Sequence, residues 1–381
     1  MSLTRTIILS LLSFVVLMPL NFTALAVQDQ AQNHDKPGNS DEDGWIEIAV
    51  FVHGISPTKK VESSDSYYES LHENIERYYN LLKSPEDKSY PFIDKHRIYV
   101  NYGANLPNTI KVTSISDDLA EAEAIIVDLD HEIWNRTKDN PESFYRTNVL
   151  AGLREIILYG LSDAVYYLSA EGTREIRGSI LNQIYRDLQG RGIIDNNGKL
   201  AEDKKLSFTL FAHSLGTVIM YDILNTIYSD FEDLDEIYTE YGSKTIVEGF
   251  IRLKQAKRIR VRKLYSFGSQ MSLMHFRKEN SISETINLQW TDVSKIFGDS
   301  EGVADPRWLN FWDKDDILGY PLEFLFQPRA KSEARIVKDI HIDVDDYLPH
   351  TIYWFNDEMA FEISRDLLGL TRAEALEILK K

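Results

Sequence analysis

The chain contains no cysteine among its 381 residues. Disulfide bonds, thiolate metal ligands and cysteine nucleophiles are therefore all excluded, and stability must come from the core. Basic side chains are also scarce, since 42 lysines and arginines face 60 acidic residues and give a net charge of −18. Such an acidic chain is a poor match for a phosphate backbone, so we expect no nucleic-acid partner. The 43% apolar content is that of a globular chain with a large core.

A long apolar run occurs only at the N-terminus. Arg5 supplies a positive charge before the nearly continuous apolar stretch 7–20, and Ala24-Leu25-Ala26 follows as a small-x-small cleavage signal. The alternative is an uncleaved anchor helix, which needs about 20 apolar residues, but Pro19 interrupts the run too early. We therefore expect residues 1–26 to be a cleaved signal peptide and the mature chain to be exported, either periplasmic or secreted.

Residues 27–43 are polar and predict a flexible leader, followed by one domain over 44–381. Strand-like and helix-like segments alternate along this domain, which predicts an α/β fold with a mostly parallel central sheet and helices on both faces. The charged, helical stretch 228–258 is expected to form a cap or an insertion. The expected strands are Trp45–Val52, Arg97–Tyr102, Ala124–Leu129, Leu206–Phe211, Arg260–Phe267, Trp308–Trp312 and Arg335–Val344. The expected helices are Tyr67–Leu82, Val149–Leu168, Ile176–Leu188, Leu215–Tyr228 and Phe355–Leu368.

The strongest functional signal is the segment Ala212-His213-Ser214-Leu215-Gly216. A predicted strand runs directly into a predicted helix through this small-x-Ser-x-Gly turn. Such a sharp turn strains the serine and exposes its hydroxyl at the carboxyl end of the strand, and small residues are needed because larger ones would clash. The other interpretation is an ordinary helix N-cap serine. The strand before it and the long apolar helix after it favour a nucleophile at Ser214.

This turn, together with the strand 48–52 that ends in His53-Gly54, resembles the α/β-hydrolase superfamily, in particular its lipase- and esterase-like serine hydrolases. Ala212 stands where a glycine is commoner in that family. The resemblance implies that an acid and then a histidine follow the serine along the chain. It also implies that the backbone amides of Ile55 and Leu215 form the oxyanion hole, and that His53 is a structural loop residue and not the base.

The expected acid lies where the aromatic strand Trp308–Trp312 runs into a cluster of acidic residues. Such a cluster is often only a solvated turn, but this one follows a buried strand downstream of Ser214. We choose Asp316, the last acid before an apolar run, and keep Asp315 as the alternative. Its role would be to accept the imidazole N–H and to stabilise the imidazolium.

The expected base is His350, which lies after the last strand and before the last long helix, where the superfamily keeps its histidine. His341 lies within a strand and is expected to be a packed or surface residue. His275 precedes the acid in chain order, which counts against it. The turn at the end of Leu264–Ser269 resembles a pocket-shaping segment of the family and is not expected to be catalytic.

These residues together predict an exported serine hydrolase that cleaves an ester or a related acyl bond through an acyl-enzyme intermediate. The substrate would be a small-molecule or lipid-like acyl compound, and no metal or organic cofactor is required. Two alternatives remain open. One is a non-catalytic binding or envelope-scaffold protein that keeps the fold, and the other is an acyltransferase that passes the acyl group to an acceptor other than water.

Overall fold

The computed structural model describes twelve stretches of the chain, all within the unit Lys36–Lys381. The expected signal peptide, the leader and the expected strand 124–129 lie outside them, as does most of the expected helix 149–168. The described residues are 44–54, 65–85, 89–100, 164, 167, 170–195, 198–228, 244–274, 290–298, 306–326, 335–344 and 349–380.

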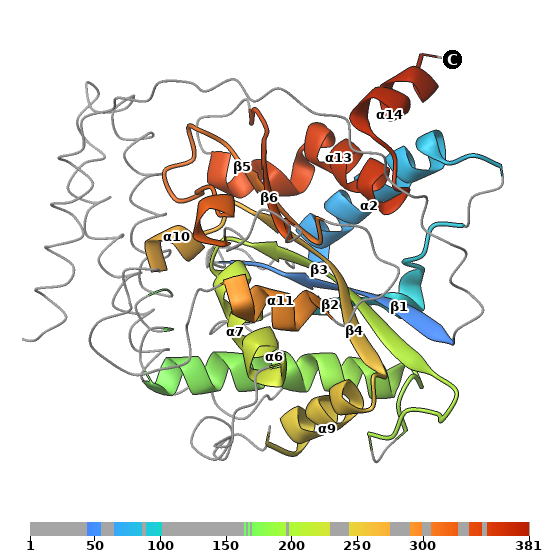
Figure 1. Ribbon diagram of the computed structural model, residues 1–381, viewed down its shortest axis with the longest axis vertical. Helices are drawn as coiled ribbons and strands as arrows, with labels where there is room; N and C mark the ends of the chain where they lie inside the picture. Colours follow the sequence, from blue (N-terminus) through green and yellow to red (C-terminus); the bar gives the residue numbers. More distant parts are fainter. Residues whose placement is uncertain are drawn as a thin grey trace, which may run out of the picture. The chain divides into compact units, whose positions relative to one another are not determined.

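Six strands form the centre of the fold: β1 (Trp45–Val52), β2 (Arg97–Val100), β3 (Lys205–His213), β4 (Ile259–Phe267), β5 (Trp308–Trp312) and β6 (Val337–His341). They make one sheet in the order β2-β1-β3-β4-β5-β6, and every neighbouring pair is parallel (Figure 1). Strands β3 and β4 are buried along nearly their whole length. Such burial is characteristic of a parallel sheet, because helices cover both of its faces.

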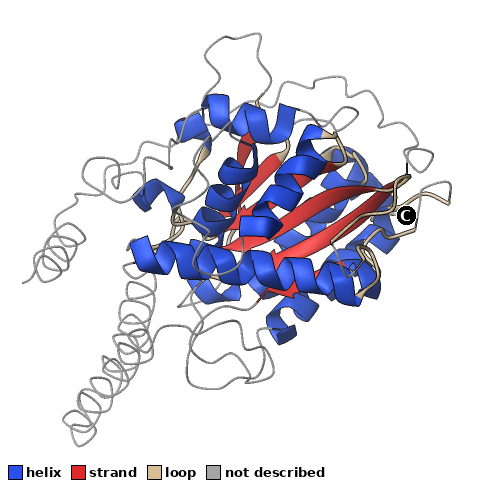
Figure 2. Ribbon diagram, turned by 90° about the horizontal axis from the view of Figure 1, so that it is seen from below, coloured by secondary structure: helices blue, strands red, loops and turns tan. Residues whose placement is uncertain are grey.

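The helices lie on the two faces of this sheet (Figure 2). They are α2 (Asp65–Leu82), α6 (Ala170–Gly190), α7 (Leu215–Tyr228), α9 (Lys244–Gln255), α10 (Met271–Met274), α11 (Trp290–Gly298), α12 (Pro349–Ile352), α13 (Asp357–Leu367) and α14 (Arg372–Ile378), with short 3-10 turns η2 (Asp94–His96), η6 (Glu323–Phe326) and η7 (Tyr353–Phe355). Ile48 and Val50 of β1 pack into one apolar cluster with α6, α7, α9 and α11, whereas Ala49 and Phe51 pack into a second with α2 and α13. Alternate side chains of a strand thus supply the two layers of the core.

The strand order changes direction between β1 and β3. From β1 the chain passes through α2 to β2 on one side, and from β2 it passes through α6 to β3 on the other side. In open α/β sheets, ligands bind beyond the carboxyl ends of the strands at such a switch point. Val52 near the end of β1 pairs with Ala212 near the end of β3, so these two ends lie side by side.

The α/β fold with a parallel sheet and helices on both faces, predicted from the sequence, is confirmed. The bounds of β1 and β5 agree with the expected ones, but β3 is longer than expected and ends at His213, directly before Ser214. The expected helix 355–368 begins two residues later than expected, because the Asn356 side chain accepts a hydrogen bond from the Met359 amide and caps the start of α13.

The stretch 228–258 was expected to form a cap or an insertion, and its described part is mainly α9. This helix packs against α6, α7 and β4, and so belongs to the helical layer on one face of the sheet. Residues 229–243 lie outside the described part of the chain. Among the helices that the structure describes, none has both the length and the apolar character needed to cross a membrane.

A buried ion pair fastens α7, the helix that follows β3, to α6. Arg177 of α6 and Asp222 of α7 form a salt bridge between side chains with no exposed surface. The hydroxyl of Tyr167 donates a hydrogen bond to the same carboxylate at 2.5 Å and accepts one from Arg177 Nε at 2.9 Å. Removing one partner of such a pair leaves the other charge buried without compensation, which is strongly destabilising.

We therefore expect Asp222→Ala to lower the free energy of unfolding by about 3–5 kcal/mol, measured by urea denaturation. The matched control is Asp187→Ala, which removes the partly exposed pair between Asp187 of α6 and Arg191, the residue directly after that helix. An exposed pair contributes at most about 1 kcal/mol. Equal losses in the two variants would contradict the view that Asp222 fastens α7.

Candidate active site

The turn between β3 and α7 holds Ser214 in a strained backbone conformation. Its φ of 54° lies in the left-handed region that L-residues other than glycine rarely adopt. The Ser214 amide donates to the carbonyl of Phe267 in β4 at 3.0 Å, and the Thr217 amide donates to the Ser214 carbonyl at 3.1 Å. Contrary to the expected exposure of the hydroxyl, the whole Ser214 residue is buried.

Two glycines let the end of β1 approach this turn closely. A Cβ at Gly216 would lie 2.4 Å from the carbonyl oxygen of His53, and a Cβ at Gly54 would lie 2.3 Å from the Cβ of Ser214. Both distances are far shorter than real contacts allow, so any larger residue would force the backbone apart. As the sequence predicts, a residue larger than glycine at Gly216 would clash with its neighbours. The same holds at Gly54.

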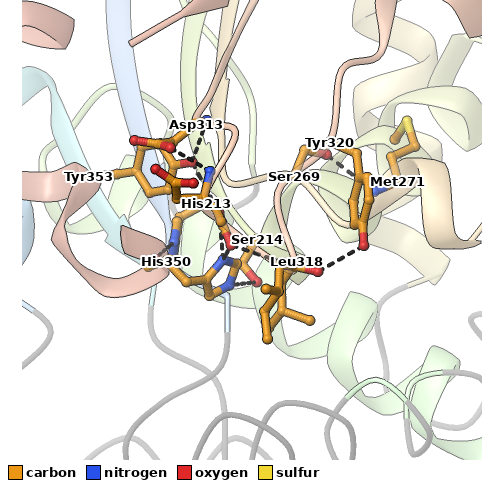
Figure 3. Close-up of polar contacts among 12 residues, drawn as sticks. His213, Ser214, Ser269, Met271, Asp313, Leu318, Tyr320, His350 and Tyr353 are labelled. Atoms are coloured by element: carbon orange, nitrogen blue, oxygen red, sulfur yellow. Dashed lines mark hydrogen bonds and ion pairs between the residues drawn. The ribbon is translucent and has the colours of Figure 1, made fainter. Parts of the chain in front are cut away.

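The structure brings Ser214 and His350 together at the carboxyl edge of the sheet (Figure 3). Asp316 lies beside the same histidine ring. His350 Nε2 lies 2.8 Å from Ser214 Oγ, and His350 Nδ1 lies 3.0 Å from each carboxylate oxygen of Asp316. An ionised carboxylate only accepts hydrogen bonds, so Nδ1 carries the imidazole proton and Nε2 is left to accept the serine O–H. All three side chains are buried.

The three acids after β5 have different environments, and only Asp316 reaches the histidine ring. The side chain of Asp315, the alternative, is 69% exposed and pairs with Lys314 at 3.2 Å. Asp313 is buried and accepts hydrogen bonds from the amides of Asp315 at 2.7 Å and Val344 at 2.5 Å. Asp313 thus holds the loop together, while Asp316 is directed at His350.

Asp316 is kept ionised by its hydrogen-bond donors. It accepts from the amide of Leu318 at 2.9 Å and from the hydroxyl of Tyr353 at 3.0 Å, as well as from His350. Burial by itself raises the pKa of Asp316, but attraction to His350 and these hydrogen bonds outweigh it, so the pKa lies below its usual value. Burial and the nearby carboxylate raise the pKa of Tyr353 far above its usual range, so its hydroxyl stays a donor.

Two further glycines make room for this carboxylate. Gly268, after β4, has a φ of 56°, and a Cβ there would lie 3.2 Å from both Asp316 Oδ2 and His350 Nδ1. A Cβ at Gly319 would lie 2.2 Å from Asp316 Oδ2 and 2.9 Å from the Gly268 Cα. The turn after β4, expected to shape the pocket, therefore lies directly against the carboxylate and the imidazole.

Of the two amides expected to form the oxyanion hole, the structure describes that of Leu215 but not that of Ile55. Leu215 is the first residue of α7, where backbone N–H groups have no acceptor within the helix and face the end of β3. Ile55 lies outside the described residues, although Gly54 before it is described and lies against Ser214. The Leu215 amide thus lies directly after Ser214 at the start of a helix, and its role in an oxyanion hole stays a prediction.

The described histidines that were alternatives to His350 as the base, His53 and His341, contact groups other than Ser214. His53 Nδ1 lies 2.8 Å from the Gly54 carbonyl, and burial lowers its pKa to about 4. This environment suits a neutral loop residue. His341 lies in β6 with its ring 5.1 Å from that of Trp312, as expected for a packed or surface residue. His275 lies outside the described residues.

Three further residues contribute to the site without a role expected from the sequence: His213, Tyr353 and Gly319. The Tyr353 hydroxyl donates to Asp316 and accepts from the Asp313 amide at 3.0 Å, so it links two acids of one loop. Its place three residues after His350, at the start of η7, is the only signal that the sequence offered. For Gly319 the sequence offered none.

Searches against protein-family models, curated proteins and solved structures found no match to this chain. Within the described ranges, no group of three or more histidine or acidic side chains is arranged to hold a metal ion.

We expect Gly319→Ala to lower the free energy of unfolding by about 1–3 kcal/mol, because its Cβ overlaps the buried Asp316 carboxylate. Gly249→Ala is the matched control, since a Cβ in this part of α9 meets nothing within 4 Å. Alanine favours a helix by up to about 1 kcal/mol over glycine, so the control variant should gain stability. Chemical denaturation would measure both, and a gain in Gly319→Ala would contradict the close packing at Asp316.

Proposed function

We propose that this chain is an exported serine hydrolase that cleaves an ester or a related acyl bond through an acyl-enzyme intermediate. The observation that carries the proposal is the continuous line of hydrogen bonds from Ser214 through His350 to Asp316. The hydroxyl is the nucleophile, the imidazole is the general base, and the carboxylate orients it. The α/β-hydrolase superfamily, with its lipase- and esterase-like members, is the family to which we assign the chain within this proposal.

The reaction proceeds in two halves. In the first half, Ser214 Oγ bonds to the substrate carbonyl carbon while its proton moves to His350 Nε2. The tetrahedral intermediate then expels the alcohol, which takes that proton as the C–O bond breaks, and an acyl-serine remains. In the second half, water gives a proton to His350, attacks the acyl carbon and releases the acid, while the proton returns to Ser214.

The surroundings support each of these roles. Asp316, ionised and buried, stabilises the imidazolium that forms during each half of the reaction and fixes the proton on Nδ1. The Leu215 amide, at the start of α7, is assigned to the oxyanion together with the Ile55 amide. The small-molecule or lipid-like acyl substrate and the export through residues 1–26 remain part of the proposal and are supported by the sequence alone.

A fluorophosphonate probe tests the nucleophile, because it bonds covalently to an activated serine. We expect the wild-type chain to be labelled and Ser214→Ala to be unlabelled, with hydrolysis of an activated ester reduced by several orders of magnitude. Ser70→Ala is the control, since this α2 serine donates to the Ser66 carbonyl within its own helix, and it should behave like the wild type.

The remaining outcomes separate the alternatives. A folded wild-type chain that resists the probe would refute the hydrolase and favour a non-catalytic binding or scaffold protein. If labelling occurs, product analysis with and without an added alcohol distinguishes hydrolysis from acyl transfer. A predominance of the alcohol ester over the free acid at low alcohol concentration would favour an acyltransferase.

The choice of acid is tested by a pair of variants. Asp316→Asn should reduce kcat by about 10⁴-fold, because an amide does not hold the imidazole in the required tautomer. Asp315→Asn, which changes a neighbouring exposed side chain, should leave kcat within about twofold. The measurement is steady-state hydrolysis of an activated ester, and a larger loss in Asp315→Asn would reverse the assignment.

A further inference from the structure

We infer that His213, the residue before the serine, is a positioning residue that holds the backbone of the base His350 in register with Ser214. The inference rests on the proposed function and adds a residue to its machinery. His213 is the last residue of β3 and is buried. Its Nε2 lies 2.6 Å from the carbonyl oxygen of His350.

The chemistry of this contact fixes the protonation of His213. A carbonyl oxygen only accepts hydrogen bonds, so the proton of the neutral ring lies on Nε2 and is donated to His350. Burial and the neighbouring His350 keep the pKa of His213 well below its usual value, so the ring stays neutral. It is therefore a permanent donor that adds no charge beside the proposed base.

The ring of His213 is itself immobilised by aromatic side chains. Its centroid lies 5.3 Å from that of Phe267 in β4 and 5.5 Å from that of Trp354 in η7. It also lies 4.9 Å from the centroid of His350. His213 Nε2 thus has a fixed position relative to the sheet, and its hydrogen bond in turn fixes the position of the His350 carbonyl.

The segment that carries His350 requires such support. α12 (Pro349–Ile352) is a single turn, and a helix this short has little stability of its own. Two consecutive residues at the end of β3 therefore hold His350 at two points. Ser214 meets the ring at Nε2, and His213 binds the main-chain carbonyl. Asp316 fixes the third point at Nδ1.

Substitutions at His213 that differ in reach test this role. Phenylalanine keeps the aromatic packing and removes the donor, whereas the amide of glutamine reaches about as far as Nε2 does. We expect His213→Phe to lower kcat and the rate of fluorophosphonate labelling about 10–100-fold, since a displacement of about 1 Å at a catalytic group has effects of that size. KM should change by less than about threefold, and His213→Gln should recover most of the loss.

The matched control is His72→Phe, at a buried histidine of α2 whose Nδ1 lies 3.1 Å from the Tyr90 hydroxyl. It also removes a buried imidazole, but should leave kcat unchanged. If His213→Phe does not fold, His213→Asn replaces it, because the asparagine amide is too short to reach the carbonyl. A kcat of His213→Phe or His213→Asn equal to that of His213→Gln would overturn the inference.

A second readout does not depend on turnover. The proton shared between His350 Nδ1 and Asp316 should give a far-downfield NMR resonance in the wild type and in His213→Gln, and this resonance should be broadened or lost in His213→Phe. An unchanged resonance in His213→Phe would also overturn the inference. Failure of the proposed function has a different signature, because the wild-type chain itself would then not react with the probe at Ser214.

Discussion

The backbone of Ser214 has a φ of 54°, which is unfavourable for an L-residue by roughly 1–3 kcal/mol. The rest of the site depends on how the sheet maintains this conformation. β4 fixes the Ser214 amide through the carbonyl of Phe267, and β1 passes so close that Gly54 and Gly216 have no room for a Cβ. Because β1 and β4 enclose the turn, the Ser214 side chain is directed past the end of β3 towards His350.

A second requirement is to keep a negative charge in the interior beside a weak base. Asp316 has a lowered pKa although burial opposes this, because His350, Leu318 and Tyr353 all donate to its carboxylate. The Tyr353 hydroxyl also accepts from the Asp313 amide, so hydrogen bonds of both His350 and Tyr353 join the segment that carries the imidazole to the loop that carries the carboxylate. These contacts hold the Asp316 side chain in one orientation. When His350 gains a proton, the carboxylate is therefore already positioned to stabilise the imidazolium.

Much of this arrangement could be predicted from the sequence, because chain order and local chemistry are both visible in it. The parallel sheet follows from alternating strands and helices, whereas His350 was expected as the partner of Ser214 because the α/β-hydrolase superfamily, which the turn resembles, keeps its histidine after the last strand. Only the apolar residues after Asp316 favoured it over Asp315, and it is the Asp316 carboxylate that lies 3.0 Å from His350 Nδ1. The role of His213 could not be predicted, since its partner is a main-chain carbonyl 137 residues away. Every residue has such a carbonyl, so the sequence does not indicate which one is bound. The burial of Ser214 could not be predicted either, because it depends on segments that are distant along the chain.

The parallel sheet has a consequence for how the protein folds. Parallel neighbours cannot be joined by a hairpin and need a crossover connection, so none of the strand pairs in this sheet is local in sequence. The serine and the histidine ring that it meets are 136 residues apart. Chains dominated by such distant contacts fold slowly, because loop-closure entropy is lost before the contacts form. Here Ser214 and His350, the proposed nucleophile and base, meet only after the chain has been synthesised beyond residue 350 and the sheet has closed, so a shorter nascent chain contains the serine without its partner.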